Sequence, residues 1–247
     1  EQQELILYYQ PIVSLKTGKI VGFEALLRWQ HLKRGMIAPN EFIPLAEETG
    51  LILPIGEWVL QEACHQLQTW QQAGIVDDAF TISINLSVRQ FAQPDLIQQI
   101  ERVLASTAIN PANLKLEITE SVIMESTSHI FQTLQRLRER QICLSIDDFG
   151  TGYSSLSYLH AFPVDSLKID RSFVQRLEET SSDMGLIPAI TSIANTLNIT
   201  VVAEGIETAH QLCKLRMLNC NFGQGYFFSQ PLPAQPATEL LLSNPQW

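Results

Sequence analysis

The chain has 247 residues, of which 45% are hydrophobic, and this is enough to bury a sizeable apolar core. Its formal net charge is −10, with 26 acidic against 16 basic residues, which argues against binding to a DNA or RNA polymer through clustered Lys and Arg. A phosphate-bearing ligand remains compatible with this charge if a metal ion offsets the acidic side chains.

Short β-rich runs alternate with helical patterns along the whole length. The predicted strands are 5–13, 20–28, 81–87, 114–119, 142–147, 166–170, 200–205 and 222–228. Apolar residues at helical spacing predict helices at 56–73, 95–106, 128–140, 183–197, 208–218 and 237–243. Eight strands with intervening helices in a chain of this length predict a (β/α)8, TIM-like barrel. An open doubly wound sheet is the alternative, and the lack of a nucleotide-type glycine turn after the first strand disfavours it.

The first two predicted strands are joined only by SLKTGK. A parallel crossover takes a dozen or more residues, so this link is too short for one. Thr17-Gly18 indicates a hairpin turn instead, and the first strand should therefore run antiparallel to the others. Because no low-complexity linker or strong internal repeat interrupts the pattern, we expect residues 1–247 to form a single domain.

The cysteines and the first residues of the chain indicate the cellular compartment that we expect for it. Cys64, Cys143, Cys213 and Cys220 form no CxxC pair, and reduced core thiols suit a cytoplasmic setting. No apolar run reaches the roughly 18 residues of a membrane span, and the acidic start lacks the basic residues of a secretion signal. The chain has no initiator Met and enters a strand-like run at once, so we expect a domain cut from a longer protein.

Almost every predicted strand carries a polar residue where a buried parallel strand should be apolar. These residues are Glu24, Asn85, Glu117, Asp147, Asp148, Lys168, Glu204 and Gln224. Taken singly, each is explained by a solvated edge, an ion pair or a turn. Together they fall toward the carboxyl ends of the strands, where barrel enzymes keep their chemistry. Five carboxylates at one mouth would repel unless cations neutralised them, and oxygen ligands without a His or Cys cluster favour Mg²⁺ or Mn²⁺.

Other kinds of site find less support. The five histidines are scattered and none pairs at metal-ligand spacing, which disfavours zinc. Ser154 and Ser155 follow Asp148, but no His occupies a matching strand position, which disfavours a serine hydrolase. The GTG and GQG turns are not followed by GK[ST], so they do not make a P-loop.

Several of these segments together resemble the EAL domains, the cyclic di-GMP phosphodiesterases. The resemblance rests on YYQPIVSLKTGKIVGFEALLRW, EFIPLAEETGLI, INLSVRQF, LEITES, DDFGTGYSSLSYL, LKIDRSFV, VVAEGIET and GQGYFFSQPL, in the order of that family. It covers about residues 5–233. It implies the barrel with a reversed first strand and hydrolysis of one phosphodiester of cyclic di-GMP to linear pGpG with two divalent cations.

The resemblance also implies roles for individual residues. The family's ligands to one ion match Glu24, Asn85, Glu117 and Asp147, and Asp147 bridges to a second ion that Asp148 also holds. Lys168 matches the lysine beside the catalytic water. Glu204 matches a position near the second metal and the water, as either base or ligand. The substrate side of the site matches Gln10, Arg28 and Gln224.

Two glutamates, Glu120 and Glu207, match residues that brace the loop after the fifth strand. Family members commonly dimerise near this loop, so a homodimer is expected. We expect the strand to end at Asp147, with the glycines of DDFGTG permitting a turn that aims both aspartates at the metals. The loop is then a candidate control point.

The chain departs from the EAL pattern at one peripheral position and matches it at every metal ligand. The family's common His-Pro is His31-Leu32 here, in a peripheral loop. Many family members have lost metal ligands and act as cyclic di-GMP receptors or regulatory modules, whereas this chain keeps every ligand position. An enzyme acting on another phosphodiester is a weaker alternative. A sensory or GGDEF domain is expected upstream in the full-length protein.

Overall fold

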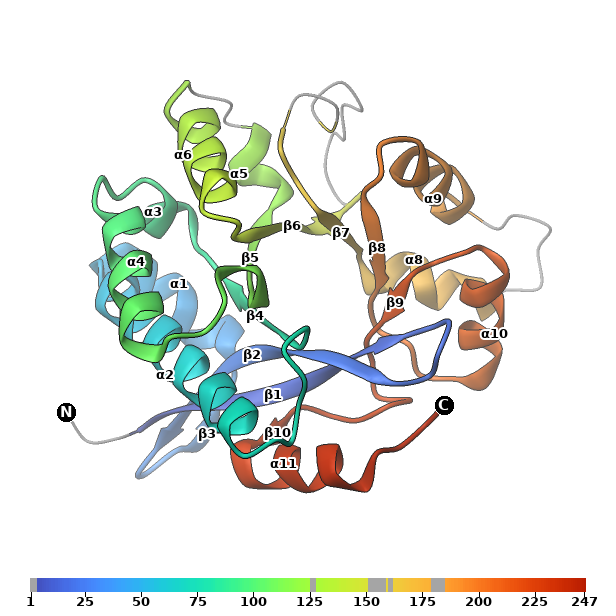
Figure 1. Ribbon diagram of the computed structural model, residues 1–247, viewed down its shortest axis with the longest axis horizontal. Helices are drawn as coiled ribbons and strands as arrows, with labels where there is room; N and C mark the ends of the chain where they lie inside the picture. The colour runs from blue at the N-terminus through green and yellow to red at the C-terminus, as the bar shows by residue number, and fades with distance from the viewer. Residues whose placement is uncertain (1–3, 125–127, 151–158, 160–161, 179–184) are drawn as a thin grey trace.

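The computed structural model describes residues 4–124, 128–150, 159, 162–178 and 185–247. A closed ring of eight strands lies at its centre, and Figure 1 looks into this ring. In order around the ring, the strands are β1 (Leu5–Ser14), β2 (Ile20–His31), β4 (Thr81–Asn85), β5 (Leu114–Thr119), β6 (Cys143–Phe149), β7 (Ser166–Ile169), β8 (Thr200–Ala203) and β9 (Phe222–Gly223). Because β9 pairs with β1 and closes the ring, the predicted barrel is confirmed.

Strand β1 runs antiparallel to both of its barrel neighbours, β2 and β9. All other neighbouring barrel strands are parallel. The reversal is made by a tight turn in which the backbone N–H of Gly18 donates to Ser14 O at 2.8 Å. Gly18 has φ +70°, and a Cβ there would collide with the backbone of Trp247. The antiparallel first strand is therefore confirmed, and glycine is required at its turn.

Two short strands extend the sheet beyond the barrel. Strand β3 (Gly35–Ile37) forms a hairpin with the end of β2, and β10 (Leu232–Pro233) pairs with β1. The sequence analysis predicts neither, because three and two residues are too few for an alternating pattern to show.

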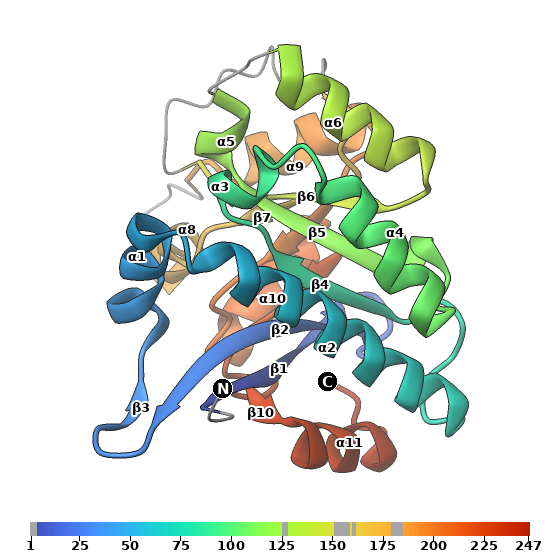
Figure 2. The same cartoon turned by 90° about the vertical axis from the view of Figure 1, so that its left-hand side faces the viewer.

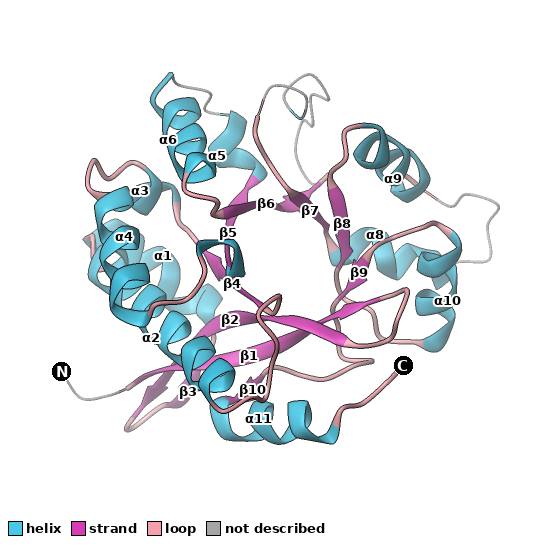
Figure 3. Ribbon diagram, viewed as in Figure 1, coloured by secondary structure: helices cyan, strands magenta, loops and turns pink. Residues whose placement is uncertain are grey.

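Helices surround the barrel, as Figures 2 and 3 show. They are α1 (Pro39–Thr49), α2 (Ile52–Gln72), α3 (Val88–Phe91), α4 (Leu96–Thr107), α5 (Glu120–Met124), α6 (Ser128–Glu139), α8 (Arg171–Gln175), α9 (Ile187–Thr196), α10 (Ala209–Met217) and α11 (Ala234–Ser243). The described residues also include two 3₁₀ turns, η1 (Pro111–Asn113) and η2 (Arg176–Glu178). None of these helices, in the part of the chain that the structure describes, is long and apolar enough to cross a membrane.

The six predicted helices correspond to α2, α4, α6, α9, α10 and α11. Helix α2 begins at Ile52, four residues before the predicted start. The prediction misses α1, which begins at Pro39 and contains Pro44, and prolines in a sequence favour a loop over a helix. It also misses α3, α5 and α8, whose four or five residues are too few for helical periodicity to show.

The last strand is much shorter than predicted. Instead of running over 222–228, β9 ends at Gly223, and a helical turn follows in which the N–H groups of Phe228 and Ser229 donate to Gly225 O at 3.1 and 3.2 Å. Gly225 presses against Ile206, and a Cβ at this position would collide with the Ile206 backbone. Strand β8 also ends two residues earlier than predicted, at Ala203. Glu204 and Gln224 therefore each lie one residue past a strand.

Alternation along the strands separates an outer apolar face from a polar interior. In β5, Leu114, Leu116 and Ile118 are buried in the hydrophobic core cluster. Glu117 faces the other way and reaches Lys168 of β7, two strands along the ring. The helices thus cover an apolar outer surface, while the inside of this barrel is available for charged groups.

Candidate metal centre

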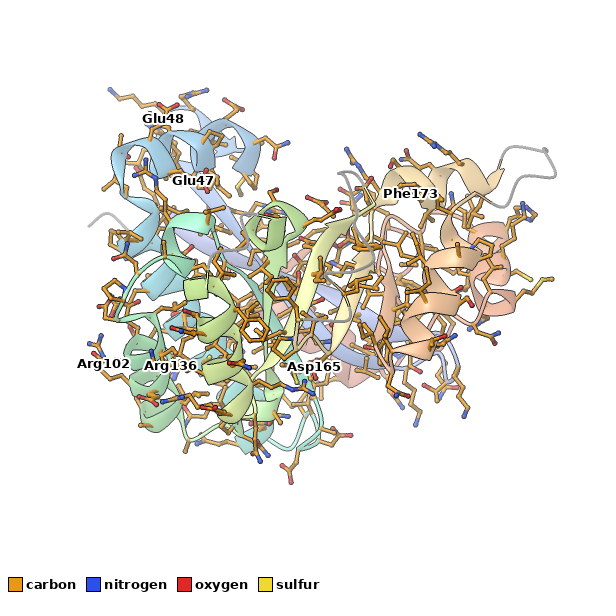
Figure 4. All side chains as sticks on the ribbon, turned by 90° about the horizontal axis from the view of Figure 1, so that it is seen from above. Glu47, Glu48, Arg102, Arg136, Asp165 and Phe173 are labelled. Atoms are coloured by element: carbon orange, nitrogen blue, oxygen red, sulfur yellow. The ribbon has the colours of Figure 1, made fainter. Side chains whose placement is uncertain are left out.

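The polar strand residues of the sequence analysis lie toward the carboxyl ends of their strands. Figure 4 labels Asp165, which directly precedes β7, and Phe173, which follows β7 and lies higher in this view. Asn85 is the last residue of β4, and Asp147 and Asp148 lie near the end of β6. Glu204 and Gln224 directly follow β8 and β9.

Lys168 is the centre of the site. Its Nζ lies 2.6 Å from Glu117 Oε2, 2.7 Å from Glu204 Oε1, 3.1 Å from Glu24 Oε2 and 3.3 Å from Asp147 Oδ1. The Lys168 side chain is 1% exposed. One ammonium group therefore contacts four carboxylates that come from four different parts of the barrel.

The charges in this cluster shift one another's protonation. Burial alone would lower the pKa of Lys168, but the carboxylates around it raise it well above its usual value. Burial raises the pKa of Glu117 and that of Glu204 to about 8, against the opposing attraction of Lys168. Burial also acts to raise the pKa of Glu24, but Lys168 and hydrogen bonds from Gln224 and Asn85 outweigh it and lower that pKa. One lysine thus only partly balances the acidic cluster.

The aspartate pair is held by a distortion in β6. The register between β6 and β7 shifts between Ile146 and Phe149, and Asp148 has φ +54°, in the left-handed region. The Asp148 N–H donates to Asp147 Oδ1 at 3.0 Å. The prediction that the strand ends at Asp147 is wrong, because β6 continues to Phe149 through this irregularity. The expected change of backbone direction occurs, but within the strand.

Three carboxylates gather at one edge of the cluster. One oxygen from each of Asp147, Asp148 and Glu204 lies within 4.8 Å of the other two. Burial and the charges of Asp147 and Asp170 raise the pKa of Asp148. Hard oxygen donors at this spacing fit Mg²⁺ or Mn²⁺ by donor type.

Amide side chains hold Glu24 from two sides. Asn85 Nδ2 donates to Glu24 Oε1 at 2.7 Å, and Gln224 Nε2 donates to Glu24 Oε2 at 2.7 Å. Gln224 Nε2 also donates to Gln10 Oε1 at 2.8 Å, and Gln10 Nε2 donates to Ser229 O at 3.2 Å. Gln10 and Gln224, predicted on the substrate side, thus also orient a predicted metal ligand.

Arg28 lies farther along β2 than Glu24. Its guanidinium carbon is 5.6 Å from the centre of the Tyr8 ring, and its Nη1 donates to Leu27 O at 2.9 Å. Tyr8 was not predicted to belong to the site, since a strand tyrosine carries no signal of a partner on the adjacent strand. The arrangement leaves a planar cation supported on an aromatic face.

Glu120 and Glu207 are the two residues predicted to support the loop after β6, and their described hydrogen bonds differ. Glu120 Oε2 accepts a hydrogen bond at 3.2 Å from the N–H of Gly150, two residues after Asp148. Glu207 is exposed, and its own N–H donates to Gln211 Oε1 at 2.7 Å. Residues 151–158 of the loop lie outside the described residues, so its role as a control point, and that of Glu207, stay predictions.

One acidic residue of this region was not predicted. Asp170 follows β7, and its Oδ1 accepts a hydrogen bond from the Ser172 N–H at 3.0 Å as the N-cap of α8. Its charge also contributes to the raised pKa of Asp148. Its position two residues after Lys168 was the available signal, but an Asp that begins a helix is more often only a cap.

Comparison with known proteins identifies the family. A family model of the EAL domain matches residues 1–231. The chain belongs to the EAL domain family. It is 45% identical over 235 residues to the bifunctional diguanylate cyclase/cyclic di-GMP phosphodiesterase MucR of Pseudomonas aeruginosa, covering 95% of this chain and 34% of that protein. It is 47% identical over 232 residues to the oxygen sensor protein DosP of Escherichia coli, covering 94% of this chain and 29% of that protein.

Solved EAL structures have the same fold. The PaMucR phosphodiesterase in its c-di-GMP complex has a TM-score of 0.91 and 44% identity, covering 96% of this chain and 95% of that chain. The EAL enzyme Bd1971, with cAMP and cyclic di-GMP bound, has a TM-score of 0.92 and 38% identity, covering 97% of this chain and 65% of that one. This EAL chain spans about a third of the length of the curated relatives it matches.

Proposed function

We propose that the chain is a metal-dependent phosphodiesterase that hydrolyses one phosphodiester of cyclic di-GMP to give linear pGpG. The observation that carries this proposal is the convergence of four carboxylates on Lys168 at the carboxyl end of the barrel, with Asp148 beside them. The relative MucR, whose name includes cyclic di-GMP phosphodiesterase, supports the choice of substrate.

The proposed metal ligands are Glu24, Asn85, Glu117, Asp147 and Asp148. Glu204 joins Asp147 and Asp148 in the close group of oxygens, which favours a ligand role for it over that of a base. Two divalent cations, Mg²⁺ or Mn²⁺, are proposed because the donors are hard oxygens in a cluster with excess negative charge. When bound, such ions lower the pKa of a coordinated water and stabilise charge on phosphate oxygens.

The remaining polar side chains position the reacting groups. Lys168 stays protonated at neutral pH because its pKa is raised by the surrounding carboxylates, so it can donate a hydrogen bond to the attacking water or offset developing charge. Gln224 and Gln10 fix the orientation of Glu24. Arg28 offers a planar guanidinium to the phosphate that is not cleaved.

A turnover assay tests this proposal. The chain is incubated with cyclic di-GMP and either Mg²⁺ or Mn²⁺, and pGpG is followed by chromatography, with EDTA as the control. We expect pGpG to accumulate with a divalent cation and to stop with EDTA. Tight binding of cyclic di-GMP without turnover in either metal would instead indicate a receptor. A panel of other phosphodiesters tests substrate choice, and an equal rate with any of them would contradict it.

The wider setting is also proposed. We propose that residues 1–247 act as one catalytic unit in a longer cytoplasmic protein with a sensory or GGDEF domain upstream. Relatives about three times as long as this chain support that arrangement. A homodimer that forms near the loop after β6 is proposed as well, and sedimentation of the chain across a concentration series would test it.

A further inference from the structure

A second tier of polar residues lies inside the barrel, deeper than the carboxylates. On four successive strands, β4 to β7, a polar residue stands two positions before the residue of the metal centre: these are Ser83, Lys115, Ser145 and Ser166. Side chains two positions apart on a strand share a face. Since the later residue of each pair faces the interior, the earlier one does too.

The three serine side chains of this tier are buried without hydrogen-bond partners. Ser83 and Ser145 are 0% exposed and Ser166 is 1% exposed. Within the described part of the chain, none of their hydroxyl groups has a partner. Ser145 and Ser166 stand directly opposite each other in the register of β6 and β7. Buried hydroxyls are almost always paired with protein or with ordered water, so three unpaired ones on the inner face of one barrel point to a bound group.

The three serines are smaller than the side chains usual at such positions. The interior of such a barrel is usually filled by Val, Ile and Leu side chains. Here β4, β6 and β7 contribute serine, whereas β8 and β9 contribute Val202 and Phe222, two positions before Glu204 and Gln224. On the side formed by β4 to β7, small hydroxyl side chains in place of branched apolar ones give a polar lining of the kind that binds internal water.

The groups that line this part of the barrel interior favour a bound water molecule over a bound ion. A metal cation would find serine hydroxyls and the amino group of Lys115 but no carboxylate in this tier, whereas carboxylate and carbonyl oxygens are the usual ligands of hard cations. An anion would lie beneath the carboxylates of Glu117 and Asp147. Water is neutral, and it both accepts from and donates to hydroxyl groups, as this lining requires.

We propose that the barrel interior beneath the carboxylates holds a small cluster of ordered water molecules, bound by the hydroxyls of Ser83, Ser145 and Ser166. These water molecules would lie directly beneath the metal centre. The buried charges of Lys168 and its carboxylates then have hydrogen-bonding groups beneath them instead of hydrocarbon. This lowers the free-energy cost of removing these charges from bulk water. This inference depends on the geometry of the barrel and not on the identity of the substrate.

A crystal structure of the whole chain tests the proposal directly. We expect ordered water within hydrogen-bond distance of at least two of the three hydroxyls. Hydroxyls that all turn to backbone carbonyls, with no density between them, would overturn it. A crystal soaked in bromide adds a second arm: an anomalous peak in this space would show an anion site and also overturn the proposal, whereas no peak there agrees with water.

Variants test the same point in solution. If water satisfies the hydroxyls, then Ser145→Ala or Ser166→Ala loses a hydrogen bond, and the unfolding equilibrium constant in urea should rise on the order of fivefold. If the interior is dry, each substitution removes an unpaired polar group and the constant should fall. Ser192→Ala, at an exposed position in α9, is the matched control and should change the constant by less than about twofold. A fall in both barrel variants would overturn the proposal.

Discussion

The ammonium nitrogen of Lys168 lies 2.6 Å from Glu117 Oε2, and both side chains are 1% exposed. Glu117 belongs to β5 and Lys168 to β7. Strand β6 lies between these two strands in the sheet, so the two side chains meet inside the barrel. A buried carboxylate is tolerated only with a partner, and Glu117 shares this partner with three others. The stability of the barrel and the charge of its site are therefore linked through one lysine.

Replacing that lysine should destabilise the fold in the absence of divalent cations. Lys168→Met keeps about the same side-chain length but removes the positive charge that contacts all four carboxylates. We expect the free energy of unfolding to fall by about 3–5 kcal/mol, the typical cost of breaking a buried ion pair. Unfolding in urea with EDTA present measures it. Lys33→Met, at an exposed position, is the control, and equal stability of the two variants would contradict the prediction.

Glu24→Gln should abolish most of the turnover while the protein stays folded. Glu24 accepts hydrogen bonds from Asn85, Gln224 and Lys168, and an amide nitrogen in its place would face donors. We expect kcat/KM for cyclic di-GMP to fall more than about 100-fold, since even partners outside the ligand set typically cost 10–100-fold. Circular dichroism checks the fold, and Glu62→Gln on exposed α2 surface serves as the control. Wild-type turnover in Glu24→Gln would show that the ligand assignment is wrong.

Asp148→Asn should raise the stability of the metal-free protein and weaken its binding of Mg²⁺. The folded state disfavours the charged form of Asp148, because burial and the charges of Asp147 and Asp170 raise its pKa. Asn tolerates the left-handed backbone at this position and carries no charge. Without divalent cations we expect Tm to rise by up to about 2 °C, a small shift because solvent screens this site. Calorimetric titration should show weaker Mg²⁺ binding.

Asp78→Asn, at an exposed position after α2, controls for a change of net charge alone. A lower Tm in Asp148→Asn, together with unchanged Mg²⁺ binding, would remove Asp148 from the metal centre.

The sequence predicts the fold well where the signal is local. The short SLKTGK link was sufficient to predict the antiparallel β1, since chain length alone excludes a crossover. The short helix α3 and the short strand β3 were missed because periodicity needs a longer window than their four and three residues. The end of β9 was misplaced because the close approach of Gly225 to Ile206 joins segments far apart in the chain.

The candidate site was predictable as a set of residues but not as a geometry. Alternation and strand position identified Glu24, Glu117 and Lys168, and the structure brings them together. That Lys168 contacts four carboxylates depends on the closure of the barrel, which no local pattern encodes. The same holds for the irregularity at Asp148 and for the buried serine tier, since one serine in a strand has no meaning until its neighbours are known.

Gly150→Ala should test whether the segment directly after the aspartate pair controls the metal centre. Gly150 has φ +98°, and a Cβ there would lie 2.9 Å from Phe173 Cε2, so alanine adds both backbone strain and a collision. We expect a loss of stability of about 1–3 kcal/mol and weaker Mg²⁺ binding, because Gly150 also donates to Glu120 two residues after Asp148. Gly35→Ala is the matched control: Gly35 has φ +70° with nothing within 4 Å of the added Cβ, so it reports the backbone strain alone. If the two variants lose equal stability and bind Mg²⁺ like the wild type, then contact with Phe173 does not position Asp148.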